Sequence, residues 1–179
     1  MASEAGLTLV EMMTVMAVMA ILLAIGVPSY KYVTSSNRMY NEAGELLGDL
    51  QFARAEATRE GLPVTVCISS DGASCLSGAT SWSNGWIVFV DHNGDQTVDS
   101  GDAVLRVQTS FSSSDTFTDS AALAAVTFNR EGFASNLGGT SALFTLHDST
   151  SNKAWTRCLY LAVQGNMGVS TPATLSSCT

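Results

Sequence analysis

The chain has 179 residues, of which 46% are hydrophobic and only 13% are charged, and its 16 acidic side chains outnumber the 8 basic ones. The length predicts one domain of ordinary size. The formal net charge of -8 argues against non-specific binding to nucleic acid, because that binding depends on Lys and Arg neutralising phosphates. Soluble domains carry about 25% charged residues, so the low charged fraction indicates that apolar residues are concentrated in one segment.

That apolar segment lies at the N-terminus. Nineteen residues without a charge, Met12 to Tyr30, separate Glu11 from Lys31, which is close to the ~20 residues that a helix needs to cross a bilayer. A secretory signal would start with basic residues and have a shorter apolar stretch. An ordinary anchor fits the length but leaves Glu11 unexplained, because a carboxylate at mid-membrane costs ~2.5 to 3.5 kcal/mol. The segment excludes a simple cytosolic globular protein and makes Glu11 a candidate functional residue.

The helical pattern continues beyond this segment, from Tyr30 to Arg59, with apolar residues at three- and four-residue spacing. Gly61 and Pro63 are expected to end the helix. Pro28 lacks a backbone donor and is expected to bend the helix or open it locally. We interpret the polar face of the second half as the solvated side of a helix that packs on a core. That polar face consists of Asn41, Glu42, Glu45, Asp49, Gln51, Arg54 and Glu56.

After Pro63 the pattern changes to runs of period two or of β-branched residues, separated by clusters of Gly, Ser, Asn and Asp. These runs predict an α+β protein in which a mostly antiparallel β-sheet head packs against the second half of the helix. Trp86 and Phe89 are expected to pack in the core or on the sheet rather than to contact a ligand. Thr109 to Ser120 is expected to form an exposed loop. The predicted strands are 63–69, 85–90, 103–108, 124–129, 141–148 and 157–163.

Four cysteines follow the apolar segment, and none forms a C-x-x-C pair of the kind that holds zinc. An even number of cysteines beyond a membrane segment favours disulfides and a periplasmic or extracellular location. Three pairings remain open, and buried free thiols are the alternative in a reducing compartment. We favour Cys67 with Cys75, which flank a short turn-forming stretch, and therefore Cys158 with Cys178.

Residues 91–102 follow the calcium-loop spacing D-x-N-x-D-x-x-V-D-x-x-D. Oxygen ligands in this pattern suit the hard cation Ca²⁺. Gln96 stands where a glycine is expected, and the last position is an aspartate instead of the longer glutamate. The alternative is a polar β-hairpin whose side chains bond their own backbone. The candidate ligands are Asp91, Asn93, Asp95, the Thr97 carbonyl, Asp99 and Asp102.

No arrangement of catalytic residues is recognisable. The two histidines, His92 and His147, are far apart in the sequence, and no G-x-S-x-G nucleophile motif is present. We therefore predict that the chain is not an enzyme and that it has no cofactor other than the calcium considered above.

The N-terminus resembles a known processing signal. The string GLTLVE, residues 6–11, followed by an apolar run with Pro28, resembles the class III signal of type IV pilins and type II secretion pseudopilins. The resemblance implies that a prepilin peptidase cuts between Gly6 and Leu7 and methylates Leu7. Glu11 and Pro28 are then residues five and twenty-two of the mature chain, as in that family. Glu11 would pair with the N-terminal amine of Leu7 in a neighbouring subunit and so set the axial register.

Four strings in the remainder of the chain are similar to the GspH/FimT branch of this family: LGDLQFARAEATREGLPVTVC, WSNGWIVFVDHNGDQTVDSGDAVLR, VTFNREGFA and RCLYLAVQGNMG. The resemblance implies a type IV pilin fold with four parts. These are a leader (1–6), a transmembrane and filament-core helix (7–28), an amphipathic helix (29–61) and a β-rich head (62–179).

The function implied by this resemblance is that of a minor pilin in the tip or initiation complex of a type IV pilus. The alternatives are a minor pseudopilin of type II secretion and a tip receptor or adhesin. The implied partners are other minor pilins, the major pilin, the prepilin peptidase and the inner-membrane assembly platform. The chain would first span the inner membrane with a periplasmic head and would then enter an extracellular pilus or a periplasmic pseudopilus.

One departure from the branch bears on DNA uptake. FimT-like proteins linked to DNA uptake carry an arginine-rich Gly-Arg stretch near the C-terminus. The matching residues here are Gly165 to Gly168, with sequence GNMG, and no Lys or Arg follows Arg157. Together with the acidic net charge, this composition argues against DNA binding by this chain.

Overall fold

The computed structural model describes residues 6, 8–111, 113–175, 177 and 178. The predicted leader residues 1–5 and the predicted new N-terminus, Leu7, lie outside the described residues. The chain divides into two compact units, residues 1–37 and 38–179, and each is treated by itself below.

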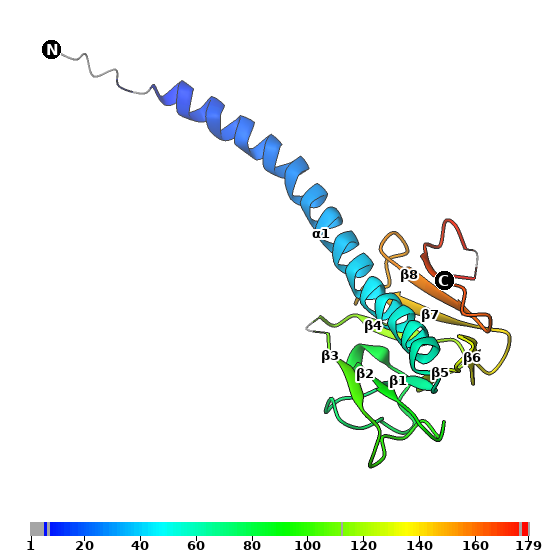
Figure 1. Cartoon of the computed structure of the whole chain (residues 1–179). Helices are drawn as coiled ribbons and strands as arrows, with labels where there is room; N and C mark the ends of the chain where they lie inside the picture. The colour runs from blue at the N-terminus through cyan, green and yellow to red at the C-terminus, as the bar shows by residue number, and fades with distance from the viewer. Residues whose placement is uncertain (1–5, 7, 112, 176, 179) are drawn as a thin grey trace. The chain divides into compact units, whose positions relative to one another are not determined.

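Helix α1, Leu9–Glu60, is continuous over 52 residues and is coloured blue to cyan in Figure 1. At its start, the Thr8 hydroxyl accepts a hydrogen bond from the Glu11 amide at 3.2 Å, which is half of a capping box. The predicted end is confirmed: Gly61 has a φ of +69° and its amide bonds the Ala57 carbonyl at 3.0 Å. Pro28 lies within α1, and the residues around it remain helical, so the local opening considered for it is not found.

The β head consists of two antiparallel sheets. The first has the order β3-β2-β1-β5-β6 and the second the order β4-β7-β8-β9. Antiparallel pairing places neighbouring strands in register, for example Val66 opposite both Val88 and Val126. The strands are β1 (Val64–Ile68), β2 (Gly85–Val90), β3 (Val104–Thr109), β4 (Thr116–Asp119), β5 (Ala125–Phe128), β6 (Ala134–Ser135), β7 (Ser141–His147), β8 (Arg157–Ala162) and β9 (Met167–Ser170).

All six predicted strands are confirmed to within two residues at each end, and the structure adds β4, β6 and β9. The prediction of an exposed loop over Thr109 to Ser120 is wrong in part. This segment contains β4, which pairs with β7, and the side chains of Phe117 and Asp119 are buried. The error arises because only Phe117 and Phe111 interrupt a run of small polar residues, so the period-two signal is weak.

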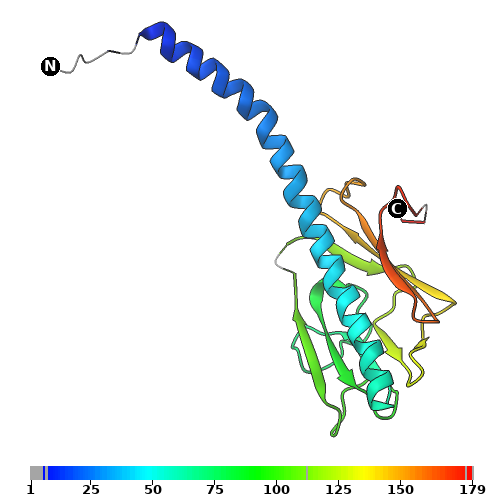
Figure 2. The same cartoon turned by 45° about the horizontal axis from the view of Figure 1, so that its top comes forward.

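The main core lies between the two sheets and the second half of α1. Aromatic rings fill this core. Trp82, in the short 3-10 helix Trp82–Asn84 before β2, packs edge-on against Phe144 of β7 at 5.4 Å between ring centroids, and Phe117 of β4 lies 6.4 Å from Phe144. Trp86 is fully buried in this cluster, as predicted. Figure 2 shows the second half of α1 running across the strands. Its fully buried apolar side chains are Met39, Ala43, Leu46, Leu50, Ala53 and Ala57.

Both predicted disulfides are present. Cys67 is bonded to Cys75 and Cys158 to Cys178, so none of the four cysteines is free. A second, smaller apolar cluster covers the outer face of the first sheet, where Phe89 packs with Cys67 and with the half-buried Cys75. The first disulfide therefore holds a loop over the outer face of the sheet, and β1 and β2 are buried on both faces.

Candidate functional site

The N-terminal part of α1 presents a continuous apolar surface. By length and composition alone, α1 is able to cross a membrane, and the most apolar window of this helix is not buried within the protein. Exposed fractions reach 76% at Leu9 and 69% at Ile25. The exposed large apolar side chains of this part are Leu9, Val10, Met12, Met13, Val15, Met16, Val18, Met19, Ile21, Leu22, Leu23, Ile25 and Val27.

Glu11 lies in the first turn of α1, and its side chain is exposed. A carboxylate in the first turn interacts favourably with the positive end of the helix dipole. In an apolar environment this interaction compensates only a small part of the desolvation cost of the charge. Glu11 therefore lies as a carboxylate at the start of a row of exposed apolar side chains.

The interpretation of the polar face of the second half of α1 as solvated is wrong in part. Asn41, Glu45, Gln51 and Arg54 are exposed, as predicted, but the other three residues of this face are not. Glu42 and Glu56 are buried, and Asp49 is half-buried. Asp49 accepts hydrogen bonds from the indole N–H of Trp86 at 2.8 Å and from Arg106 Nη1 at 2.9 Å. The Arg106 guanidinium also lies 3.7 Å from the ring centroid of Phe52, a cation–π contact.

Arg54 joins α1 to one turn of each sheet. Its Nε donates to the Gly132 carbonyl at 3.0 Å, in the turn between β5 and β6. Its Nη1 donates to the Gly165 carbonyl at 3.0 Å, and its Nη2 to the Gln164 carbonyl at 3.3 Å, in the turn between β8 and β9. The rigid fork of the guanidinium is suited to bonding several acceptors at once. Arg54 is therefore a point at which the helix and both sheets are fastened together.

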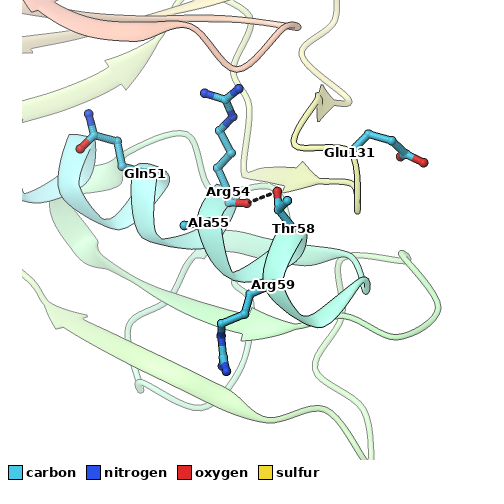
Figure 3. A pocket seen from close by; sticks show the side chains of 6 residues that line it. All are labelled: Gln51, Arg54, Ala55, Thr58, Arg59 and Glu131. Atoms are coloured by element: carbon cyan, nitrogen blue, oxygen red, sulfur yellow. Dashed lines mark hydrogen bonds between the residues drawn. The ribbon is translucent and has the colours of Figure 1, made fainter.

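An open groove of about 760 Å³ runs beside the end of α1. Figure 3 shows Arg54 and Arg59 leaving the helix in opposite directions. The charged side chains along this groove already have partners within the head. Arg54 bonds the three backbone carbonyls named in the preceding paragraph, Arg59 bonds Glu56, and Glu131 bonds Arg130 at 2.8 Å. The groove is lined by Gln51, Arg54, Ala55, Thr58, Arg59 and Glu131. These internal pairings are typical of a structural surface.

At the first turn of the second unit, one cation faces two buried acids. Arg38 binds Asp115 through two hydrogen bonds, Nε at 2.8 Å and Nη2 at 3.0 Å. Glu42 accepts a hydrogen bond from the Ser113 hydroxyl at 3.2 Å, and its Oε1 lies 3.9 Å from Arg38 Nε. Burial is the largest cause that raises the pKa of Glu42, and the negative charge of Asp115 raises it further, to about 7.

The predicted calcium ligands lie in one loop between β2 and β3. Asp91 is fully buried and accepts the Gly94 amide at 2.7 Å and the Gln96 amide at 3.0 Å. Gln96 has a φ of +65°, the conformation expected of the missing glycine. The Asn93 side-chain amide donates to Asp95 at 2.9 Å and to Asp99 at 3.1 Å.

Asp102, the last of the predicted ligands, accepts the Asp99 amide at 3.0 Å and the His92 amide at 3.2 Å. Over the described residues, no group of three or more His, Cys, Asp or Glu is arranged to hold a metal ion. The five side chains thus bond one another and the backbone of their own loop, and calcium binding stays a prediction.

Sequence reasoning missed the contacts of Arg38, Asp49 and Arg54. Asp49 and Arg54 lie on the polar face of the amphipathic pattern, and Arg38 precedes that face on the same helix. Charge alone does not distinguish a solvated side chain there from one that bonds the head. A usable signal was the pair of glycines that Arg54 requires, Gly132 and Gly165, which lie in strings already noted for their family resemblance.

The exposed apolar helix and the two-sheet head define the class of the protein: a subunit with a type IV pilin fold, a membrane-anchoring N-terminus and a soluble head. Comparison with known families agrees. The family model described as type II transport protein GspH matches residues 42–165, and the prokaryotic N-terminal methylation motif matches residues 1–27. The chain belongs to the GspH family, whose members are structural pilin and pseudopilin subunits.

Two solved structures are similar in fold. The type IV minor pilin FimU of Pseudomonas aeruginosa has a TM-score of 0.61 at 20% identity, over 79% of this chain and 94% of that chain. The minor pseudopilin EpsH of the Vibrio cholerae type 2 secretion system has a TM-score of 0.52 at 11% identity, over 74% of this chain and 96% of that chain. Among curated proteins, no sequence gives a significant match.

Proposed function

We propose that the chain is a minor pilin, processed between Gly6 and Leu7, that enters the initiating or tip complex of a type IV pilus through the first half of α1. The observation that carries the proposal is the row of exposed apolar side chains from Leu9 to Val27. Fully burying a side chain such as Leu, Ile or Met contributes about 1.5 to 3 kcal/mol. A surface of this size needs lipid before assembly and neighbouring helices after it.

Glu11 supplies the specificity in this proposal. Burial among apolar helices is costly for a lone carboxylate, whereas a paired one is tolerated when the geometry is good. The amine of Leu7, created by cleavage, is a cation that every processed neighbouring subunit carries. Pairing between this amine and Glu11 would favour subunits in the correct axial register and disfavour unprocessed ones.

The test uses the full chain in its native host, with the chromosomal copy deleted and replaced by wild-type, Glu11→Gln or Glu131→Gln variants. Glu131 is the matched control, because it is an exposed head carboxylate that pairs with its neighbour Arg130. We expect Glu11→Gln to be processed and held in the membrane but depleted from sheared pili, and Glu131→Gln to behave as wild type. Wild-type amounts of Glu11→Gln in sheared pili would refute the pairing.

The same strains separate the pilus from the alternative, a minor pseudopilin of type II secretion, which the description of the matching family favours. We expect deletion to reduce surface pili and twitching and to leave secretion of type II substrates unchanged. Normal piliation with lost secretion would assign the chain to the secretion system instead.

Processing is tested on the purified protein. Mass spectrometry of the mature N-terminus is expected to find a methylated Leu7, and a Gly6→Val variant is expected to keep its leader. An unmethylated start at another residue would overturn the proposed cleavage site.

A further inference from the structure

We propose that Glu42 is protonated in mild acid and donates a hydrogen bond to Asp115. The connection between β3 and β4 then docks on α1 tightly in mild acid and loosely in mild alkali. The connection contains Ser113 and Asp115, and both contact the first helical turns of the second unit. This pH-dependent contact lies within the head and is independent of the role proposed for the N-terminal helix.

The buried charges around Glu42 are unbalanced. Two acids, Glu42 and Asp115, lie together with Arg38, and the side chains of the acids are 12% and 1% exposed. Arg38 directs both of its hydrogen bonds to Asp115 and lies 3.9 Å from Glu42. One cation therefore neutralises Asp115 and leaves a second buried carboxylate without a full counter-charge, which is costly unless that group takes up a proton.

One oxygen of Glu42 is buried without a hydrogen bond among the described residues. Glu42 Oε1 accepts the Ser113 hydroxyl, but Glu42 Oε2 is buried and has no hydrogen-bond partner among the residues that the structure describes. A carboxylate oxygen in that position is unfavourable. A carboxylic acid resolves it, because the proton on one oxygen becomes a donor, and a hydrogen bond between Glu42 and Asp115 favours the protonated form.

The surrounding charges support this assignment. On the same helix, the charge of Arg38 lowers the pKa of Glu42, and in the β3–β4 connection the charge of Asp115 raises it. Burial raises the pKa of Asp148, which follows β7, but hydrogen bonds from Thr150 and Asn152 and the charge of Arg38 together bring it below its ordinary value. Asp148 therefore competes for the positive charge of Arg38, and this charge stabilises the ionised form of Glu42 less.

The direction of the pH effect follows from linkage. Burial and Asp115 raise the pKa of Glu42 from 4.5 to about 7 in the folded chain. The stability that protonated Glu42 contributes is full below the unfolded-state value and is lost as the pH rises through about 7. Above that pH, two carboxylates share one guanidinium, and repulsion is relieved if Asp115 and Ser113 move away from the helix.

The experiment compares full-length wild type with Glu42→Gln in detergent micelles, from about pH 5 to about pH 9. A glutamine amide donates to Asp115 and accepts from Ser113 at every pH, so it imitates the protonated acid. Glu45→Gln is the matched control: Glu45 lies one turn further along α1, its pKa is also raised by burial and by Asp49, and it bonds Gln108 instead of the connection.

The first readout is hydrogen exchange at the amides of residues 113–115, taken as the ratio of wild type to Glu42→Gln at each pH, so that intrinsic exchange rates and any effect of His92 or His147 cancel. We expect wild-type protection to fall ~10-fold or more relative to Glu42→Gln at the alkaline end, with an upper limit of ~300-fold set by one factor of ten per pKa unit. Glu45→Gln is expected to follow wild type. The same pH dependence in wild type and Glu42→Gln would overturn the proposal.

The second readout needs no variant to fold. In wild-type chain with ¹³C-labelled glutamate, the side-chain carboxyl signal of Glu42, assigned through its backbone, is expected to titrate near neutral pH. A midpoint in the ordinary carboxyl range would show that Glu42 is ionised throughout and would end the proposal. A near-neutral midpoint together with altered exchange at residues 113–115 supports it.

Discussion

Replacement of Arg54 by alanine is the sharpest test of how the head is held to the helix. The substitution removes three hydrogen bonds, two of 3.0 Å to partly buried acceptors and one of 3.3 Å to an exposed carbonyl. A hydrogen bond that involves a charged group contributes about 1.5 to 3 kcal/mol. We take the lower value for the two shorter bonds and nothing for the third, because solvent competes there. Arg54→Ala is therefore expected to lower the free energy of unfolding by about 3 kcal/mol.

Equilibrium urea unfolding of the full chain in detergent, followed by tryptophan fluorescence, measures this loss. The same change is expected to lower Tm by about 6 to 12 °C, since about 1 kcal/mol corresponds to about 2 to 4 °C in a chain of this size. Arg54→Lys keeps the charge but not the fork, so it should recover about half of the loss. The control is Arg130→Ala, an exposed arginine that pairs with its neighbour Glu131, expected to change stability by less than about 0.5 kcal/mol.

A double-mutant cycle with Gly165 makes the test specific to the proposed contact. A Cβ on Gly165 would lie 2.5 Å from Arg54 Nε and 2.6 Å from the Gly132 carbonyl oxygen, and Gly165 has a φ of +77°. Gly165→Ala is therefore destabilising by itself, and part of that cost should vanish once Arg54 is alanine. Additive effects, or an Arg54→Ala variant as stable as the control, would refute the view that this side chain fastens the two turns.

Three further outcomes are expected. Leu46→Ala, which empties a fully buried position, should cost about 2 to 5 kcal/mol of unfolding free energy by urea titration, and a loss below about 1 kcal/mol would contradict its place in the core. The Cys158→Ser, Cys178→Ser double variant opens a loop with a sequence separation of 20 and should lose about 3 kcal/mol, measured as the difference from wild type under non-reducing conditions. If residues 91–102 bind calcium, Tm should be higher in calcium than in chelator at low ionic strength for wild type and equal for Asp99→Asn; equal values in wild type would remove the prediction.

Four of the six predicted strands, β1, β2, β5 and β8, are mostly buried. The runs 85–90 and 157–163 bury most of their side chains, so hydrophobic and β-branched residues dominate them. The strands that sequence reasoning missed are different: β4 buries alternate residues in a Ser- and Thr-rich segment, β6 has two residues, and β9 is half-buried along its length. Their pairing is determined by the neighbouring strand more than by their own composition, which is why a local pattern does not show them.

The polar face of α1 illustrates a second limit. An amphipathic pattern indicates which side of a helix is apolar, and it implies solvent on the other side only when the helix has one neighbour. Here the helix packs on two sheets, and side chains from β2 and β3 reach around to Asp49. Charged residues at such positions are selected by the geometry of single hydrogen bonds, which the spacing of residues along one helix does not encode.

The turn at Gly165 bears on DNA uptake as well as on the packing of the head. By the resemblance drawn from the sequence, the stretch from Gly165 to Gly168 matches the place where FimT-like proteins linked to DNA uptake carry arginine. In this chain the backbone of Gly165 is approached by Arg54, and a Cβ on Gly168 would lie 2.9 Å from the ring of Tyr160. Both glycines are thus explained by close packing within the protein. The turn also offers its carbonyl oxygens to a guanidinium from the helix, so its polar groups are committed to holding the head together.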